Sequence, residues 1–84
     1  MKGARRYLGY EVGFGACKHE GRWYPSVTEG FVDEGGHETV YRLPFEHKFN
    51  ALEAAKALAE TRITLAERLL NRWAHRLLEH TERH

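Results

Sequence analysis

Cysteine and histidine are the side chains of this sequence that best suit metal binding or nucleophilic catalysis. Cys17 and His19 form a Cys-x-His pair, and His37 and His47 follow at longer spacing. Such side chains are zinc ligands, and a cysteine beside basic residues can act as a nucleophile. However, the spacing matches no zinc finger, a second cysteine is absent, and the sequence shows no accompanying acid or oxyanion site. We therefore expect turn and surface histidines here, with no metal, no cofactor and no catalytic residue.

Arginine and tyrosine side chains are the best candidates for contacts with nucleic acid. Basic residues neutralise phosphates and aromatic rings stack on bases, so the two types together suit single strands or duplex backbones. The residues concerned are Arg5, Arg6, Arg22, Tyr24, Arg42, Arg68, Arg72 and Arg76. The net charge is only +1, whereas nucleic-acid binders usually carry a clear basic excess. A solvated helix face also explains the last three arginines, so nucleic-acid binding is the alternative function here.

Size and composition restrict the function classes further. The chain has 84 residues, 42% hydrophobic and 30% charged, which is typical of one small globular domain. A chain this short buries only about 60% of its unfolded surface, so a catalytic cleft would compete with the core; we expect no enzyme. No apolar run is long enough to span a membrane, and one cysteine cannot form an internal disulfide. These features predict a cytoplasmic protein with no membrane contact.

The first half of the chain has the composition of strands and turns. Apolar residues alternate with polar or small ones over residues 7–16, and runs rich in β-branched and aromatic residues cover 22–32 and 37–43. Residues 33–36, Asp-Glu-Gly-Gly, are typical of a hairpin loop. We predict a three-stranded antiparallel meander over about 7–44, preceded by a frayed segment at residues 1–5.

The second half predicts one long amphipathic helix over about 51–79. No Gly or Pro follows Asn50, and Asn50 with Glu53 is a typical capping pair. Eight apolar residues form one stripe at 100° per residue: Leu52, Ala55, Ala59, Ile63, Ala66, Leu70, Trp73 and Leu77. The predicted fold class is α+β, a single βββα domain over residues 1–84 with frayed residues at 80–84. Which face of the sheet the helix covers stays open.

The predicted helix is longer than the predicted sheet. About thirty helical residues span roughly 45 Å, whereas strands of about seven to ten residues span only about 23–33 Å. Each large apolar side chain left in water on the overhang forgoes about 1.5–3 kcal/mol. We expect a second copy of the chain to cover them as a homodimer, while the alternative is a helix break near Thr61 and Thr64. The interface residues are Leu69, Leu70, Trp73, Leu77 and Leu78.

Arg62 is a charged residue among the apolar positions of this helix face. It either extends its charged end into solvent or pairs with a strand carboxylate such as Glu29.

The sequence predicts an overhanging helix and shows no set of residues that could form a catalytic site. We therefore expect a non-catalytic interaction module that self-associates through its C-terminal helix. A different protein partner is an open variant, and a DNA- or RNA-binding accessory domain is the alternative.

The sequence resembles known proteins in two ways. Over most of its length, the chain resembles small uncharacterised bacterial proteins of unknown function, in its order of three strands and one helix and in a set of short motifs. The motifs are Tyr7-x-Gly9-Tyr10, Gly21-Arg22-Trp23 and Phe49-x-x-Leu52-x-x-Ala55, with Trp73 late in the helix. Residues 49–57 are also similar to the strand-to-helix junction of the arm-type DNA-binding domain in tyrosine-family phage integrases. This second resemblance implies the three-strand-plus-helix layout and DNA as the partner of the alternative function.

Overall fold

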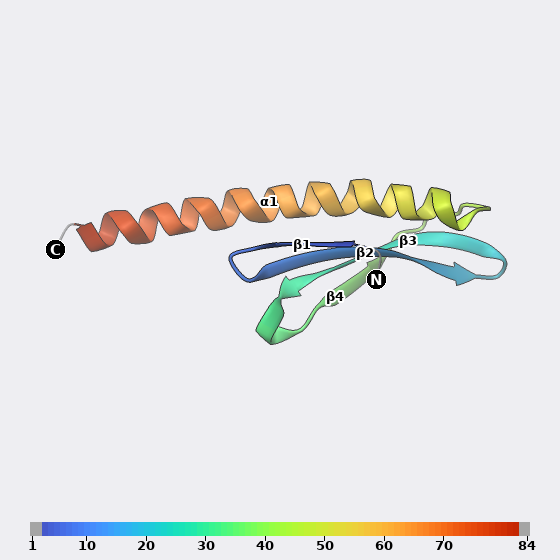
Figure 1. Cartoon of the computed structure of the whole chain (residues 1–84), viewed down its shortest axis with the longest axis horizontal. Coiled ribbons are helices and arrows are strands. Elements are labelled where there is room, and N and C mark those ends of the chain that lie inside the picture. Colours follow the sequence, from blue (N-terminus) through green and yellow to red (C-terminus); the bar gives the residue numbers. More distant parts are fainter. Residues whose placement is uncertain (1–2, 83–84) are drawn as a thin grey trace.

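Two-residue turns divide the N-terminal half of the chain into hairpins. Leu8 and Gly9 (φ 49° and 83°) and Glu20 and Gly21 (φ 50° and 80°) have the positive φ values that type I′ turns require. In the computed structural model, which describes residues 3–82 and the side chains of residues 4–78, these turns join strands β1 (Gly3–Tyr7), β2 (Tyr10–His19) and β3 (Arg22–Phe31). With β4 (His37–Val40), the described residues form an antiparallel sheet in the order β1-β2-β3-β4 (Figure 1).

The predicted antiparallel sheet with a C-terminal helix is confirmed, but the prediction of three strands is wrong. Alternation over residues 7–16 predicted one strand, whereas the turn at Leu8 and Gly9 splits this run. Residues 3–5, expected to be frayed, belong to β1, which pairs with β2 so that Arg5 lies opposite Val12. The period of two continues on both sides of a two-residue turn, so it does not reveal the reversal of the chain.

The connection from β3 to the helix differs from the predicted loop and third strand. A short 3₁₀-helix, η1 (Val32–Glu34), takes the place of part of the loop, and β4 ends at Val40 rather than at residue 43. The chain nevertheless stays beside β3. The Tyr41 amide donates to Pro25 O at 2.9 Å, and Phe45 exchanges two 2.8 Å backbone hydrogen bonds with Trp23. These bonds lead the chain to the start of the helix.

Helix α1 (Lys48–Glu82) lies across one face of the sheet (Figure 1). Side chains at every fourth position face the same way, and small ones let a helix approach a sheet closely. The helix buries Ala51, Ala55, Ala59 and Ile63 in this way. Ala59 and Ile63 pack with Val12 and Val27 to form the core cluster. The helix therefore covers the face of the sheet that carries these two valines.

The helix is continuous through Thr61 and Thr64, so the alternative of a break there is wrong. Each threonine hydroxyl donates to a backbone carbonyl one turn earlier, at 3.2 Å and 2.9 Å respectively, which accommodates these residues within a helix. The helix begins at Lys48, so Asn50 lies in its first turn and not at the predicted cap. Its end at Glu82 lies beyond the predicted residue 79, and residues 1–2 and 83–84 lie outside the described residues.

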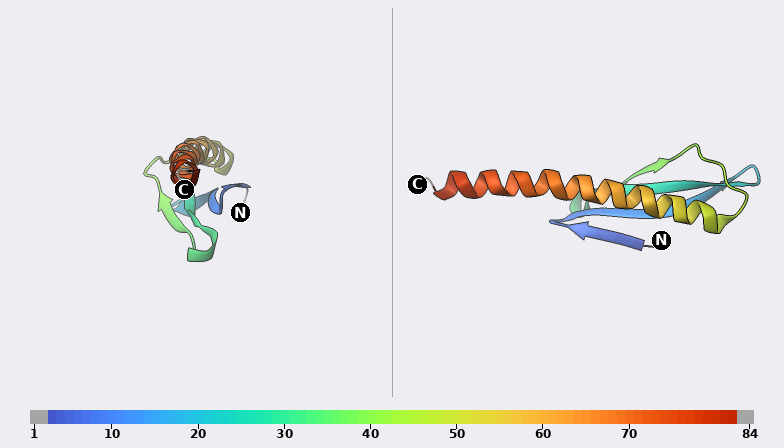
Figure 2. Two further views of the ribbon diagram at one scale, coloured as in Figure 1. Left: turned by 90° about the vertical axis from the view of Figure 1, so that its left-hand side faces the viewer. Right: turned by 90° about the horizontal axis from the view of Figure 1, so that it is seen from above.

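The predicted overhang of the helix is present in the structure. Helix α1 has 35 residues, which is about 52 Å at 1.5 Å per residue. The molecule measures 60 × 21 × 18 Å, and its radius of gyration of 16.0 Å exceeds the roughly 12 Å of a compact chain of this length. Among the described side chains Ile63 is the last buried one. Residues 66–82, here called the distal segment, lead past the end of the sheet (Figures 1 and 2).

Candidate functional site

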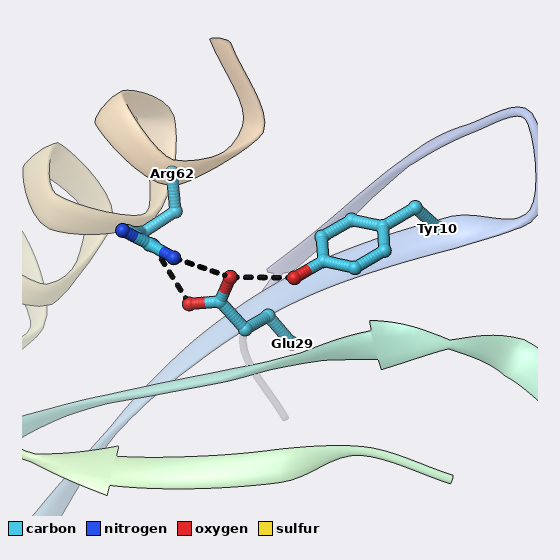
Figure 3. Close-up of polar contacts among 3 residues, drawn as sticks. All are labelled: Tyr10, Glu29 and Arg62. Carbon is cyan, nitrogen blue, oxygen red and sulfur yellow. Dashed lines mark hydrogen bonds and ion pairs between the residues drawn. The ribbon is translucent and has the colours of Figure 1, made fainter. Parts of the chain in front are cut away.

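Tyr10, Glu29 and Arg62 form a polar clasp between the sheet and the helix (Figure 3). Arg62 directly precedes Ile63, the last buried residue among the described side chains of α1. Arg62 Nε donates to Glu29 Oε2 at 2.8 Å, and Arg62 Nη2 donates to Oε1 at 3.0 Å. The Tyr10 hydroxyl donates to the same Oε1 at 2.6 Å. The predicted pairing of Arg62 with Glu29 is therefore confirmed. Because a guanidinium held by two bonds has a fixed plane, the clasp helps to fix the rotation of the helix about its axis.

The clasp changes the pKa of each of its three members. The hydrogen bond from Arg62 lowers the pKa of the Glu29 carboxyl below its ordinary 4.5, against the opposing effect of burial. Burial, followed by the hydrogen bond to Glu29, raises the pKa of Tyr10 above 10.0. The hydrogen bond to Glu29 raises the pKa of Arg62. The lowered pKa of Glu29 favours the charged carboxylate that accepts the bonds holding the helix to the sheet.

The distal segment exposes large apolar side chains to solvent. Trp73 is 64% exposed, and three leucines are 53–63% exposed: Leu69, Leu77 and Leu78. Leu70 is half-buried. The structure thus places all five predicted interface residues on the part of the helix that leads beyond the sheet. Leu69, Leu70, Trp73 and Leu77 form one row within about 100° around the helix, whereas Leu78 lies about 180° from Leu69. An apolar row of this kind is typical of interaction sites in proteins.

A second apolar surface, here called the sheet end, lies where the distal segment leaves the sheet. It consists of Leu8 (61% exposed), Phe31 (37%) and Val32 (49%). The Val32 amide donates to Gly9 O at 2.9 Å, so the β1–β2 turn and η1 form one surface. Phe31 packs edge-on against Tyr10, with ring centroids 5.1 Å apart. Sequence reasoning missed this surface because it placed Leu8 within a continuous strand and treated residues 22–32 as one strand.

The residues predicted for nucleic-acid contact do not gather on one surface of the described chain. Arg5 lies opposite Val12 on the helix-covered face, and Arg6 on the other face donates to Glu11 at 2.9 Å. The three helix arginines lie one turn apart on the distal segment, from a position opposite the apolar stripe to one beside it, at 100° per residue. They are Arg68, Arg72 and Arg76.

The far end of the sheet brings a second group of these predicted residues together. Tyr24 and Arg42 line an open hollow of about 480 Å³ with His19. Arg22 lies opposite His19 in the register of β2 and β3. This end of the sheet lies beside the start of α1. It is therefore opposite the end at which the distal segment leaves the sheet (Figure 1).

The side chains suited to metal binding are dispersed. Cys17 and His19 lie on β2, His37 begins β4, and His47 precedes α1. Within the described part of the chain, no group of three or more histidine, cysteine, aspartate or glutamate side chains is placed to hold a metal ion. Cys17 is a free, half-buried thiol whose cross-strand neighbour is Tyr24.

Comparison of the chain with models of protein families, with curated proteins and with solved structures finds no match. Within residues 3–82, no helix combines the length and the apolar composition needed to cross a bilayer. We therefore infer the function from the chain's own surfaces, above all the distal segment and the sheet end.

Proposed function

We propose that this chain is a non-catalytic interaction module of the cytoplasm that self-associates through the distal segment of α1. The observation that carries the proposal is the row of Leu69, Trp73 and Leu77, each more than half exposed, on a helix that extends beyond its own sheet. A second copy carries the same surface, so a symmetric pair covers both rows at once.

The energy available from the distal segment is comparable with the cost of forming a dimer. Covering the exposed parts of Leu69, Trp73 and Leu77 would contribute about 3–5 kcal/mol per chain, or roughly twice that per dimer. Association itself costs about 4–15 kcal/mol in lost translational and rotational freedom. The burial of these side chains therefore offsets much of the association cost, and any further contact surface would strengthen the dimer.

The proposal is tested by the molar mass of three purified forms of the full chain. Trp73→Glu places a charge in the apolar row, whereas His75→Glu places the same charge two residues on, about 200° around the helix. Light scattering on the peak eluted from size-exclusion chromatography should show a dimer for the wild type and for His75→Glu. It should show a monomer for Trp73→Glu, with the helical circular dichroism retained. A dimeric and folded Trp73→Glu form would overturn the proposal.

Nucleic-acid binding is the second candidate, and one observation favours it: Tyr24 and Arg42 line the same hollow. An aromatic ring beside an arginine can stack a base and contact a phosphate. A mixed-sequence oligonucleotide is titrated with the protein at low and at moderate salt. Binding that weakens with salt, is lost in Arg42→Ser and persists in Arg68→Ser would support this candidate, and no binding at low salt would remove it.

A further inference from the structure

The apolar row of the distal segment continues the helix face that already lies on the sheet. Ala55, Ala59 and Ile63 are buried against the sheet. At 100° per residue the later members of the stripe lie within the same sector of the helix. They are Ala66, Leu70, Trp73 and Leu77. Because α1 is nearly straight (Figure 2), this row faces the same side of the helix as the sheet does, directly beyond the end of the sheet.

This collinearity restricts how a second helix can pack on the row. In a dimer with parallel helices, both sheets would lie at the same level and between the two helices. Packed helix axes lie about 8–10 Å apart, whereas a stack of helix, two sheets and helix needs roughly 30 Å. The sheets would therefore hold parallel helices apart over most of their length. In an antiparallel pair each sheet lies beyond the other chain's helix end, and the two distal segments can pack side by side.

An antiparallel pair also brings the end of one helix to the sheet of the other. The distal segment is about 25 Å long, so two of them packed over their full length fill the space between the two sheets. The surface that each helix end meets is the sheet end of the other chain. Leu8 and Val32, which are 61% and 49% exposed, lie on that surface.

The area needed for a stable dimer argues for the same contact. The apolar side chains on the sheet-facing side of the distal segment are Leu69, Leu70, Trp73 and Leu77. They correspond to an interface of about 600 Å² per chain, which is below the roughly 800 Å² of a standard stable interface. Adding the three side chains of the sheet end raises the area to about 850 Å² per chain. The second surface thus brings the interface to the standard size.

We propose that two copies of this chain associate with antiparallel helices, each helix end docking on the sheet end of the other copy. This inference rests on the proposed self-association and adds its orientation and a second contact surface. The partner is a second copy because its sheet end supplies the area that the distal segment alone lacks for a standard interface. Leu77 near one helix end and Val32 of the other copy are brought close together in this arrangement.

Distance measurement between two spin labels distinguishes the orientations. Glu53 is exposed near the start of α1, so Glu53→Cys in a Cys17→Ser background places one label per chain away from the interface. Pulsed electron spin resonance should give a distance of about 60 Å, set by the two helix lengths on either side of the symmetry axis. A distance of about 30 Å would indicate parallel helices and overturn this inference while leaving self-association in place. Absence of dipolar coupling at high concentration would overturn the self-association as well.

A matched pair of valine variants tests the second contact surface. Val32 at the sheet end and Val40 on β4 are 49% and 47% exposed. Val32→Asp should weaken the dimer at least about tenfold, since the change occurs twice in a symmetric interface, whereas Val40→Asp should change the dissociation constant by less than about threefold. Equal effects of the two variants, with both folded by circular dichroism, would show that the sheet end is not part of the interface.

Discussion

Replacing Glu29 with glutamine measures how strongly the polar clasp holds α1 on the sheet. The Glu29 side chain is 15% exposed and accepts hydrogen bonds of 2.8, 3.0 and 2.6 Å from Arg62 and Tyr10. Bonds to a charged group contribute about 1.5–3 kcal/mol, but Arg62 is 46% exposed and water screens its charge. Glutamine keeps one acceptor oxygen, so we expect a loss of about 1–2 kcal/mol and a melting temperature lower by about 5–15 °C.

The pH dependence of the same variant separates the charge from the shape of the side chain. Because folding lowers the pKa of Glu29 below 4.5, the stabilisation is fully present above that pH and is lost as the pH falls through the folded-state pKa. Urea unfolding at fixed protein concentration, followed by circular dichroism, should show the advantage of the wild type shrinking in acid. A glutamine variant as stable as the wild type at neutral pH, or a difference that acid leaves unchanged, would refute the clasp.

Three other substitutions test the fold that carries the interface. Tyr10→Phe removes the 2.6 Å hydrogen bond to Glu29 and should lower the free energy of unfolding by about 1 kcal/mol. Because folding raises the pKa of Tyr10 above 10.0, this contribution is present below pH 10 and is lost in stronger alkali. If the wild type and the variant lost stability equally in alkali, this role of Tyr10 would be wrong. Ile63→Ala empties a site that is 2% exposed and should cost about 2–5 kcal/mol in denaturant unfolding, whereas a loss below about 1 kcal/mol would contradict the core assignment. Gly9→Ala forces a side chain to φ 83° and should cost about 1–2 kcal/mol, so wild-type thermal stability would mean that the turn has another geometry.

The long elements of the fold could be predicted from periodicity, but the turns between them could not. The apolar stripe through Ile63 and Trp73 predicted the helix, and its length predicted the overhang. The turn at Leu8 and Gly9 was missed because alternation continues across it, and β1 was missed with it. Asn50 has the chemistry of a cap, yet the bonds between Phe45 and β3 lead the chain into the helix earlier. Such tertiary bonds leave no periodic signal in the sequence.

The candidate site was predictable where a residue conflicted with its surroundings. Arg62 stands at an apolar position of the helix, and a charge there needs a partner, which made Glu29 a reasonable choice. Tyr10 as the third member depends on the register of β2 and β3, which composition does not determine. The sheet end depends on the packing of η1 against the β1–β2 turn, through the bond from Val32 to Gly9. Both features join segments far apart in the chain.

Sedimentation equilibrium of the unmodified chain tests the central claim most directly, because it reports the mass in solution without a label or substitution. The exposed row from Leu69 to Leu77 predicts a monomer–dimer equilibrium that reaches twice the mass of one chain at micromolar concentration. A folded chain that keeps the mass of a single copy up to submillimolar concentration would contradict the claim that a second copy covers the distal segment.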